Sequence, residues 1–475
     1  MVDADIRDHD SQAAKTVSQL IKNARAVQSF FSIADQATVD AAVAGAAWAI
    51  LEPSRNRRLA EQAVLDTELG NVDDKIRKNY RKTLGLLQDL RDVKTVGVIH
   101  HDEKTGLTEI ARPVGVVAAL TPSTNPAATP ANNVINALKG RNAIILAPSP
   151  KGAATCNMLL EFIHRELRKV GLPTDLVQQL PLPGSKTLAA ELMRQADLVV
   201  ATGSRANVQA AYKSGKPALG VGAGNVAAIV LPAANPVVAA ERIAYSKTFD
   251  HATSCSSENS VIAIEPTADV LLAALVDAGG VVITAEEKAR LQAILFQESG
   301  LNTACIGKGA VHIATLAGLD EARFRSARFL IVEETGAGPA HPFSGEKLSP
   351  VLTFYRVGHF DAALDLVTRI YNYQGKGHSV GLHGADEQEA LRAATFLPVC
   401  RVILDQIHCV ATGGASNNGL PFSLSMGCGT WGGNGFSDNL NYRHFLNITR
   451  VVRPIAPVET SPSALLGDYW QRYGR

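Results

Sequence analysis

Apolar residues recur at helical spacing through the first 93 residues, and short apolar runs replace this pattern further on. The helical spacing in the first 93 residues predicts amphipathic helices. Ser32 or Asp35 can cap one of them, and Pro53 suits the first turn of the next. Polar residues 71–74 then precede a third, basic helix that ends near Asp92. The amino-terminal part is therefore predicted to be helical.

A short β-hairpin is predicted at residues 96–112. Its two sides, Val96–Ile99 and Leu107–Ala111, flank a polar turn at Asp102–Gly106. Both sides are short and weakly amphipathic, so we expect the hairpin to project and to pair with another subunit.

Strands and helices alternate between residues 114 and 221. The predicted strands are 114–120, 143–147, 176–180, 198–201 and 218–221, and the predicted helices are 127–138, 153–170, 186–194 and 205–214. This alternation is typical of an open parallel sheet, which binds ligands at the carboxyl ends of its strands. The loops predicted there are 121–126, 147–151 and 202–204.

A second α/β block is predicted from Pro236 to about His408. Residues 413–436 after it are dense in glycine, and residues 448–452 form a strand-like run suited to edge pairing. We therefore predict an α/β protein with three units, at residues 1–235, 236–446 and 447–475.

Composition narrows the class of protein. The chain has 475 residues, 46% hydrophobic and 19% charged, with a net charge of +1. These values predict a globular protein with neither a nucleic-acid partner nor a membrane partner. No secretion segment is recognised at the amino terminus. The six cysteines form no C-x-x-C pair, so we expect no disulfide framework, no metal site and a cytoplasmic location.

One cysteine, Cys255, lies in the small polar stretch 249–260, between a predicted helix and the apolar run 261–264. Structural cysteines usually lie inside apolar runs, whereas a reachable thiol can act as a nucleophile. A loop cysteine without a chemical role is the alternative. His378, His383 or His408 could pair with Cys255, or could be ordinary core or surface residues.

Three further motifs have two interpretations each. The glycines of 220–225 favour a turn for close backbone approach over a dinucleotide fingerprint, because 226–231 resembles another strand. Residues 202–204 precede a helix, whose amino terminus can bind a pyrophosphate or simply be capped. Asn125, in a proline-flanked turn, can donate to an oxyanion or form an Asx turn.

The order of these motifs resembles that of the aldehyde dehydrogenase superfamily, and in particular its coenzyme-A-acylating branch, which includes half of the bifunctional aldehyde-alcohol dehydrogenases. The matching strings span roughly residues 114–446. They are Thr121–Pro126, Ala211–Ala218, Gly220–Asn225, Phe249–Ser260, Lys347–Leu352 and Ser425–Asn434.

The resemblance implies an aldehyde-dehydrogenase-like fold. In it, residues 1–235 hold a nicotinamide cofactor, residues 236–446 are catalytic, and the hairpin and the tail join subunits into a homodimer or homotetramer. Cys255 matches the nucleophile and Asn125 the oxyanion donor. The residues expected at the cofactor are Thr121, Ser149, Lys151, Gly184, Thr202, Gly203, Ser204, Gly222 and Glu346.

Two departures from the hydrolytic branch carry information. Hydrolytic members have a glutamate base where this chain has Gly222–Asn225, and Gly-Gln where it has Thr253–Ser254. A glycine turn cannot activate water, so we expect the acyl group to pass to coenzyme A. The alternatives are a hydrolytic enzyme with another base, such as Glu258 or Glu333, and a phosphorylating reductase.

Two short segments of the sequence indicate which cofactor and which substrate we expect. Ser149, Pro150 and Lys151 stand where NAD-preferring relatives carry an acid, which favours NADP over NAD. The loop with His251 before Cys255 resembles that of acylating sulfoacetaldehyde dehydrogenases. His251, with Lys247 or Arg443, could favour an anionic aldehyde. We therefore expect sulfoacetaldehyde as substrate, with succinate semialdehyde and acetaldehyde or propionaldehyde as alternatives.

Overall fold

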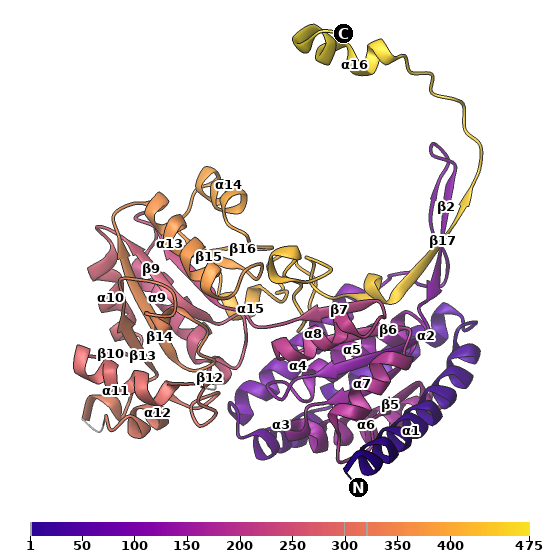
Figure 1. The fold of residues 1–475 in the computed structure, drawn as a ribbon, viewed down its shortest axis with the longest axis horizontal. Coiled ribbons are helices and arrows are strands. Elements are labelled where there is room, and N and C mark those ends of the chain that lie inside the picture. The colour runs from indigo at the N-terminus through magenta and orange to yellow at the C-terminus, as the bar shows by residue number, and fades with distance from the viewer. Residues whose placement is uncertain (1, 299, 320–321) are drawn as a thin grey trace.

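A computed structural model shows two α/β lobes joined side by side, with an arm that projects from one of them (Figure 1). It describes residues 2–298, 300–319 and 322–475. One lobe contains a five-stranded sheet and the other a seven-stranded sheet. The predicted α/β class and the doubly wound arrangement are confirmed.

The amino-terminal part is helical, as predicted, but it contains four helices where three were predicted from the sequence. They are α1 (Val2–Phe31), α2 (Gln36–Leu51), α3 (Pro53–Thr67) and α4 (Val72–Leu90). Asp35, rather than Ser32, caps α2 by accepting from the Thr38 amide at 2.8 Å. Pro53 occupies the first turn of α3, and Asn71 caps α4.

The first sheet is parallel, with strand order β5-β4-β3-β6-β7. Its strands are nearly continuous runs of buried Val, Ile, Leu and Ala, as expected where helices cover both faces. The elements are β3 (Val116–Thr121), α5 (Ala128–Lys139), β4 (Ala143–Pro148), α6 (Ala153–Lys169), β5 (Val177–Gln179), α7 (Lys186–Gln195), β6 (Leu198–Thr202), α8 (Arg205–Lys213) and β7 (Ala218–Val221).

The second sheet, also parallel, has the order β10-β13-β14-β9-β8-β15-β16. Its strands are β8 (Val226–Val230), β9 (Glu258–Ile264), β10 (Gly280–Val282), β13 (Phe329–Glu333), β14 (Val351–Val357), β15 (Val380–His383) and β16 (Val402–Leu404). The main helices are α9 (Pro236–Thr248), α10 (Ala268–Asp277), α11 (Ala285–Leu295), α12 (Ala310–Leu316), α13 (Phe360–Tyr373), α14 (Glu387–Phe396) and α15 (His408–Ala411).

Strand pairing places the crossover between the two sheets earlier than the predicted limit at 235. β8 pairs with β9 and β15, so it belongs to the second sheet although it precedes that limit. The cause is the short connection 222–225, which carries the chain from the edge strand β7 of one sheet to the interior strand β8 of the other. The functional limits of the three units stay a prediction.

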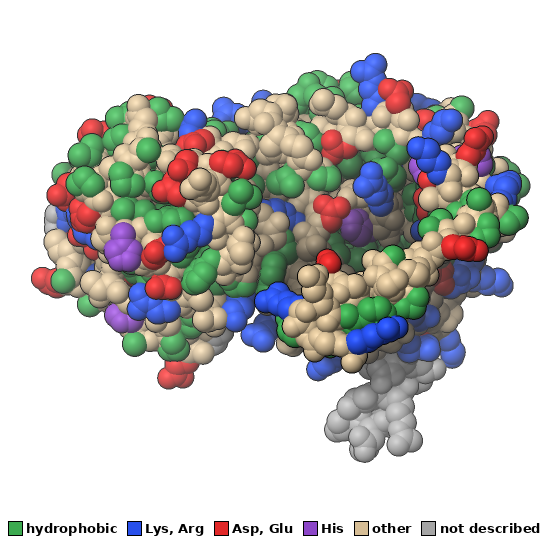
Figure 2. All heavy atoms as spheres, turned by 90° about the horizontal axis from the view of Figure 1, so that it is seen from above, with side chains coloured by type: hydrophobic (Ala, Val, Ile, Leu, Met, Phe, Trp, Pro, Cys, Tyr) green, Lys and Arg blue, Asp and Glu red, His purple; other side chains and the backbone are tan. Residues whose placement is uncertain are grey.

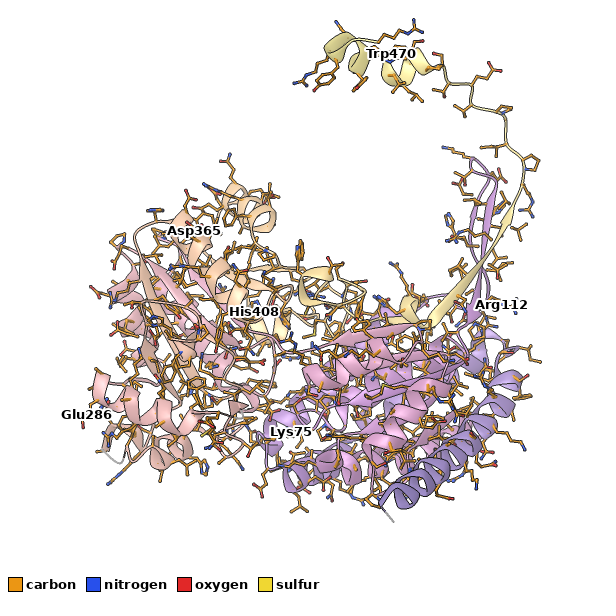
Figure 3. The ribbon with its side chains drawn as sticks, in the orientation of Figure 1. Lys75, Arg112, Glu286, Asp365, His408 and Trp470 are labelled. Atoms are coloured by element: carbon orange, nitrogen blue, oxygen red, sulfur yellow. The ribbon has the colours of Figure 1, made fainter. Side chains whose placement is uncertain are left out.

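The hairpin consists of β1 (Gly97–Asp102) and β2 (Leu107–Pro113), and β17 (Leu446–Val452) pairs with β2. The predicted edge pairing of the tail therefore occurs within this chain. Beyond β17 the chain extends to α16 (Pro462–Tyr473), which carries Trp470 away from the body (Figures 1 and 3).

Acidic and basic side chains are interspersed on the face shown in Figure 2, in agreement with the net charge of +1. Within residues 2–298, 300–319 and 322–475, we find no helix with the length and apolarity needed to cross a membrane.

Candidate active site

A cavity of about 420 Å³ lies where the two lobes meet, and nine of the predicted site residues line it. They are Thr121, Asn125, Ser149, Thr202, Gly203, Ser204, Gly222, Cys255 and Glu346. The loops after β3, β4 and β6 form the side that belongs to the first sheet, at the carboxyl ends of its strands.

The second sheet contributes the amino ends of its strands to the cavity. Gly224, Cys255 and His378 lie shortly before β8, β9 and β15 respectively. These three strands are parallel neighbours, with β8 in the middle, so their amino ends meet at one edge of the sheet. The site is thus enclosed between the carboxyl edge of one sheet and the amino edge of the other.

The loop that carries Cys255 has an unusual backbone. Asp250, His251 and Ala252 have φ angles of 50°, 51° and 57°, in the left-handed region. Non-glycine residues rarely adopt this conformation, and it costs free energy that the surroundings must offset.

Asp250 supplies that offset through its buried carboxylate. Its Oδ2 accepts from Lys75 Nζ at 3.1 Å and from Lys78 Nζ at 2.5 Å, and its Oδ1 accepts from the Asn71 amide at 3.0 Å. Burial alone would raise the pKa of Asp250, but the charges of Lys78 and Lys75 outweigh it and hold the pKa below its ordinary value. The first turns of α4 therefore fix the cysteine loop. Lys75 lies at the junction of the lobes (Figure 3).

Of the three candidate histidines, His378 is the partner of Cys255. Its Nε2 lies 3.3 Å from Cys255 Sγ, and its Nδ1 lies 2.7 Å from Ser379 Oγ. His408 Nδ1 instead contacts the Ser256 carbonyl at 2.9 Å, and His383 Nδ1 lies 3.8 Å from Asp405. The distance between the imidazole ring and Cys255 Sγ distinguishes the three histidines, and this distance cannot be derived from the sequence.

Burial keeps the Cys255–His378 pair neutral at rest. Burial, and then the neighbouring Glu346, raise the pKa of Cys255 to about 12. Burial, and then Arg401, lower the pKa of His378 to about 3. A neutral imidazole can accept the thiol proton at Nε2 while its Nδ1–H donates to Ser379. Nε2 is therefore placed to accept the thiol proton, but these two pKa values make the transfer unfavourable until sulfur bonds to an electrophile.

Asn125 is held by a lysine. Lys78 Nζ lies 2.8 Å from Asn125 Oδ1. Because an ammonium group only donates, the amide atom that faces it must be the oxygen, and the Nδ2 donors are turned elsewhere. Asn125 lines the same cavity as Cys255, so its amide group is available to an oxygen that gains charge there.

The glycine turn at 222–225 allows the close approach that the sequence predicted. A Cβ on Gly224 would lie 2.2 Å from the Cys255 carbonyl oxygen and 3.1 Å from the His378 ring. The Gly224 amide donates to Glu346 Oε1 at 3.2 Å, and burial raises the pKa of Glu346 to about 8. The turn presents no carboxylate of its own.

The two alternative bases do not line the cavity. Both carboxylate oxygens of Glu258 are buried in β9, and Glu333 is exposed beside Arg356. Neither position supports the hydrolytic alternative.

Hydroxyl groups gather where the resemblance expects a nicotinamide cofactor. The Thr121 Oγ1 atom is buried and has no hydrogen-bond partner among the described residues. Ser204 caps α8 by accepting from the Asn207 amide at 3.3 Å, and Thr202 Oγ1 lies 2.6 Å from Ser425 Oγ. An unsatisfied hydroxyl and a helix amino terminus fit a pyrophosphate and a ribose.

Three predicted residues lie outside the cavity lining. Lys151 is exposed in the turn after β4, and Gly184 lies before α7. His251 Nδ1 lies 3.2 Å from the Gly307 carbonyl, so the ring contacts the chain's own backbone. None of these three lines the cavity, although Lys151 follows Ser149 by two residues, and their roles stay predictions.

Two site residues, Lys78 and Lys82, were missed in the sequence. Lys75, Lys78 and Lys82 follow each other at spacings of three and four, which places them on one face of α4. All three are buried. Lysines are rarely buried without a partner, so a basic helix with this spacing could have indicated a site.

Comparison with known proteins agrees with this geometry. The sequence pattern of the aldehyde dehydrogenase family matches residues 4–286. The chain is 61% identical to the sulfoacetaldehyde dehydrogenase (acylating) of Cupriavidus necator, covering 98% of this chain and 94% of that protein. It is 36% identical to the succinate-semialdehyde dehydrogenase (acetylating) of Clostridium kluyveri, covering 92% and 95% of the two chains.

A solved structure resembles the whole fold. The acetylating aldehyde dehydrogenase of Geobacillus thermoglucosidasius superposes with a TM-score of 0.91 at 35% identity, covering 96% of this chain and 100% of that one. The chain belongs to the aldehyde dehydrogenase family. The predicted class of enzyme, an acylating aldehyde dehydrogenase, is confirmed, and enzymes of this class use NAD(P)+ and coenzyme A.

Proposed function

We propose that this protein oxidises sulfoacetaldehyde to its acyl-coenzyme A thioester through Cys255. The observation that carries the proposal is the Cys255–His378 pair beside a glycine turn that holds no general base. The 61% identical relative, whose name is sulfoacetaldehyde dehydrogenase (acylating), supports the substrate.

Each residue of the site has a separate role in the proposed reaction. His378 Nε2 accepts the thiol proton as Cys255 Sγ forms a bond to the aldehyde carbon. Asn125 Nδ2 and the Cys255 amide donate to the oxygen that becomes negative. A nicotinamide cofactor, which Thr121, Thr202 and Ser204 would hold, would supply the hydride acceptor. The cysteine then carries the acyl group as a thioester. Because the 222–225 turn lacks the glutamate that hydrolytic members use to activate water, we propose that the thiol of coenzyme A takes the acyl group by exchange, and its proton returns to Cys255 Sγ.

The test is an assay of the purified protein with sulfoacetaldehyde and NADP+, with and without coenzyme A. We expect turnover that depends on coenzyme A and a thioester product identified by mass spectrometry. Steady release of the free acid without coenzyme A would contradict the proposal and favour the hydrolytic alternative. Turnover that requires phosphate instead would favour the reductase that acts on acyl phosphates.

We propose NADP as the preferred nucleotide. Lys151 is exposed next to Ser149, and the turn 149–151 holds no acid that would repel a 2′-phosphate. The same assay with NAD+ in place of NADP+ tests this preference, which a higher kcat/KM with NAD+ would refute.

We propose that the chain forms homodimers or homotetramers and works in the cytoplasm. The strands of the hairpin and β17 project from the body, and exposed apolar residues continue along the tail at Ile455, Val458 and Leu465. Six free cysteines suit a reducing compartment. The mass of the full chain in solution tests the first point, and cell fractionation tests the second.

A further inference from the structure

Lys82 is a buried cation in the wall of the active-site cavity. Its side chain comes from α4 and lines the cavity together with Cys255, Cys409 and Met426. Only 4% of Lys82 is exposed. Its Nζ donates to the Gly413 carbonyl at 2.5 Å and contacts the Gly414 carbonyl at 3.4 Å.

Lys82 differs from the other two lysines on this face in its lack of a counter-charge. Lys75 and Lys78 both form ion pairs with Asp250. Among the residues that the structure describes, no carboxylate lies within 4.0 Å of Lys82 Nζ. The acid on the same helix, Asp89, accepts from the Phe422 amide at 2.6 Å instead. Burial, and then the charge of Arg81, lower the pKa of Lys82 to about 7.

A buried ammonium group without a counter-charge is costly, and an anion that entered the cavity would lower that cost. The ammonium has three N–H donors, and its two carbonyl contacts leave one of them for such a ligand. Lys82 Nζ packs closely on Gly413, where a side chain would not fit, because a Cβ there would lie 2.6 Å from Lys82 Nζ and 2.6 Å from the Ser423 carbonyl.

The position of Lys82 along α4 also indicates the length of the substrate. Lys78 holds Asn125, the proposed donor to the aldehyde oxygen, and Lys82 follows one turn later. A helix rises about 6 Å over four residues. This separation suits a short aldehyde with one or two carbon atoms between its carbonyl carbon and its charged group, as in sulfoacetaldehyde and succinate semialdehyde.

We propose that Lys82 is the specificity-determining residue that binds the negatively charged end of a short aldehyde, a sulfonate or a carboxylate. The inference rests on the proposed function and deepens it. It assigns the choice of an anionic substrate to Lys82 rather than to His251, which contacts Gly307.

The test compares kcat/KM for sulfoacetaldehyde, succinate semialdehyde and uncharged propionaldehyde in the wild type and in Lys82→Gln. Glutamine removes the charge and keeps an N–H donor, on a side chain that is one atom shorter. We expect the ratio of anionic to neutral kcat/KM to fall about 10- to 100-fold, the range for hydrogen bonds to charged groups. A fall for the sulfonate alone or for both anions supports the proposal, and the difference between the two arms identifies the preferred anion.

Two variants serve as controls. Lys22→Gln removes one positive charge from the exposed face of α1, so it should leave the ratio within about twofold. Lys82→Arg keeps the charge and should retain most of the anionic preference. If Lys82→Gln lowers all three aldehydes equally, or leaves the ratio within threefold, Lys82 is only a structural residue and the proposal is wrong.

A binding measurement separates this proposal from the proposed function. Ethanesulfonate, an anion without an aldehyde, should raise the melting temperature of the wild type more than the same concentration of chloride. This difference should disappear in Lys82→Gln and persist in Lys82→Arg. Absence of the shift in the wild type would overturn the anion site, whereas a shift without any acyl-coenzyme A formation would overturn the proposed function alone.

Discussion

Replacing Cys255 with alanine is expected to lower kcat for acyl-coenzyme A formation by roughly 10⁴-fold or more, with the fold retained. Cys409 also lines the cavity, but Cys255 is the cysteine whose Sγ lies 3.3 Å from His378 Nε2 and whose backbone packs against Gly224. The measurement is single-turnover formation of reduced nucleotide with each variant. Cys156→Ala, which removes a thiol from the core of α6, is the matched control and should keep near-normal turnover.

The same cysteine gives a pH dependence with a definite sign. Because burial raises the pKa of the Cys255 thiol to about 12, the thiol stays protonated at neutral pH, and its thiolate fraction grows about tenfold for each pH unit. Alkylation of Cys255 by iodoacetamide should therefore accelerate from pH 7 to pH 9 without the plateau of an ordinary thiol near 8.5. A plateau below pH 8 would contradict a neutral resting pair, and near-normal turnover by Cys255→Ala would remove the cysteine from the mechanism.

Local features of the fold could be predicted because they depend on short stretches of sequence. The buried strand β4 and the helix α6 begin at the predicted residues, since an apolar run and a helical pattern each mark their own limits. Cys255 and Asn125 could be identified for a similar reason, because each stands in a short recognisable motif. The sheet to which a strand belongs could not be predicted in this way. The sequence of β8 is compatible with either sheet, and only its neighbouring strands show to which one it belongs.

The parts of the site that escaped prediction depend on distant contacts. His378 meets Cys255 across 123 residues, and it does so because β15 and β9 flank β8. The sequence contains no strand order, so it could not favour His378 over His383 or His408. Lys78 and Lys82 are similar, because a basic helix is usually solvated and only the packing of the two lobes buries this one.

Lys78→Met is expected to lower kcat about 10²- to 10³-fold, close to the effect of losing an oxyanion donor outright. Lys78 Nζ contacts both Asp250 and Asn125, so its loss frees the Asn125 amide to rotate and loosens the cysteine loop. The measurement is kcat and KM with saturating cofactor. Most of the loss should fall on kcat, because the charge that the amide stabilises develops only as the bond to sulfur forms.

The chain offers a matched control in Lys75→Met. Lys75 is also buried and also pairs with Asp250, but its Nζ contacts the Thr124 carbonyl at 3.4 Å instead of the Asn125 side chain. Removing one partner of a buried ion pair costs about 3–5 kcal/mol, so both variants should unfold at lower temperature. Only Lys78→Met should lose the larger part of kcat.

A double-mutant cycle with Asn125→Ala then isolates the contact by which Lys78 orients the Asn125 amide. If Lys78 acts through Asn125, the double variant should be little slower than Asn125→Ala alone. Equal losses of kcat in the two lysine variants, or additive losses in the cycle, would show that Lys78 supports the loop without orienting the amide.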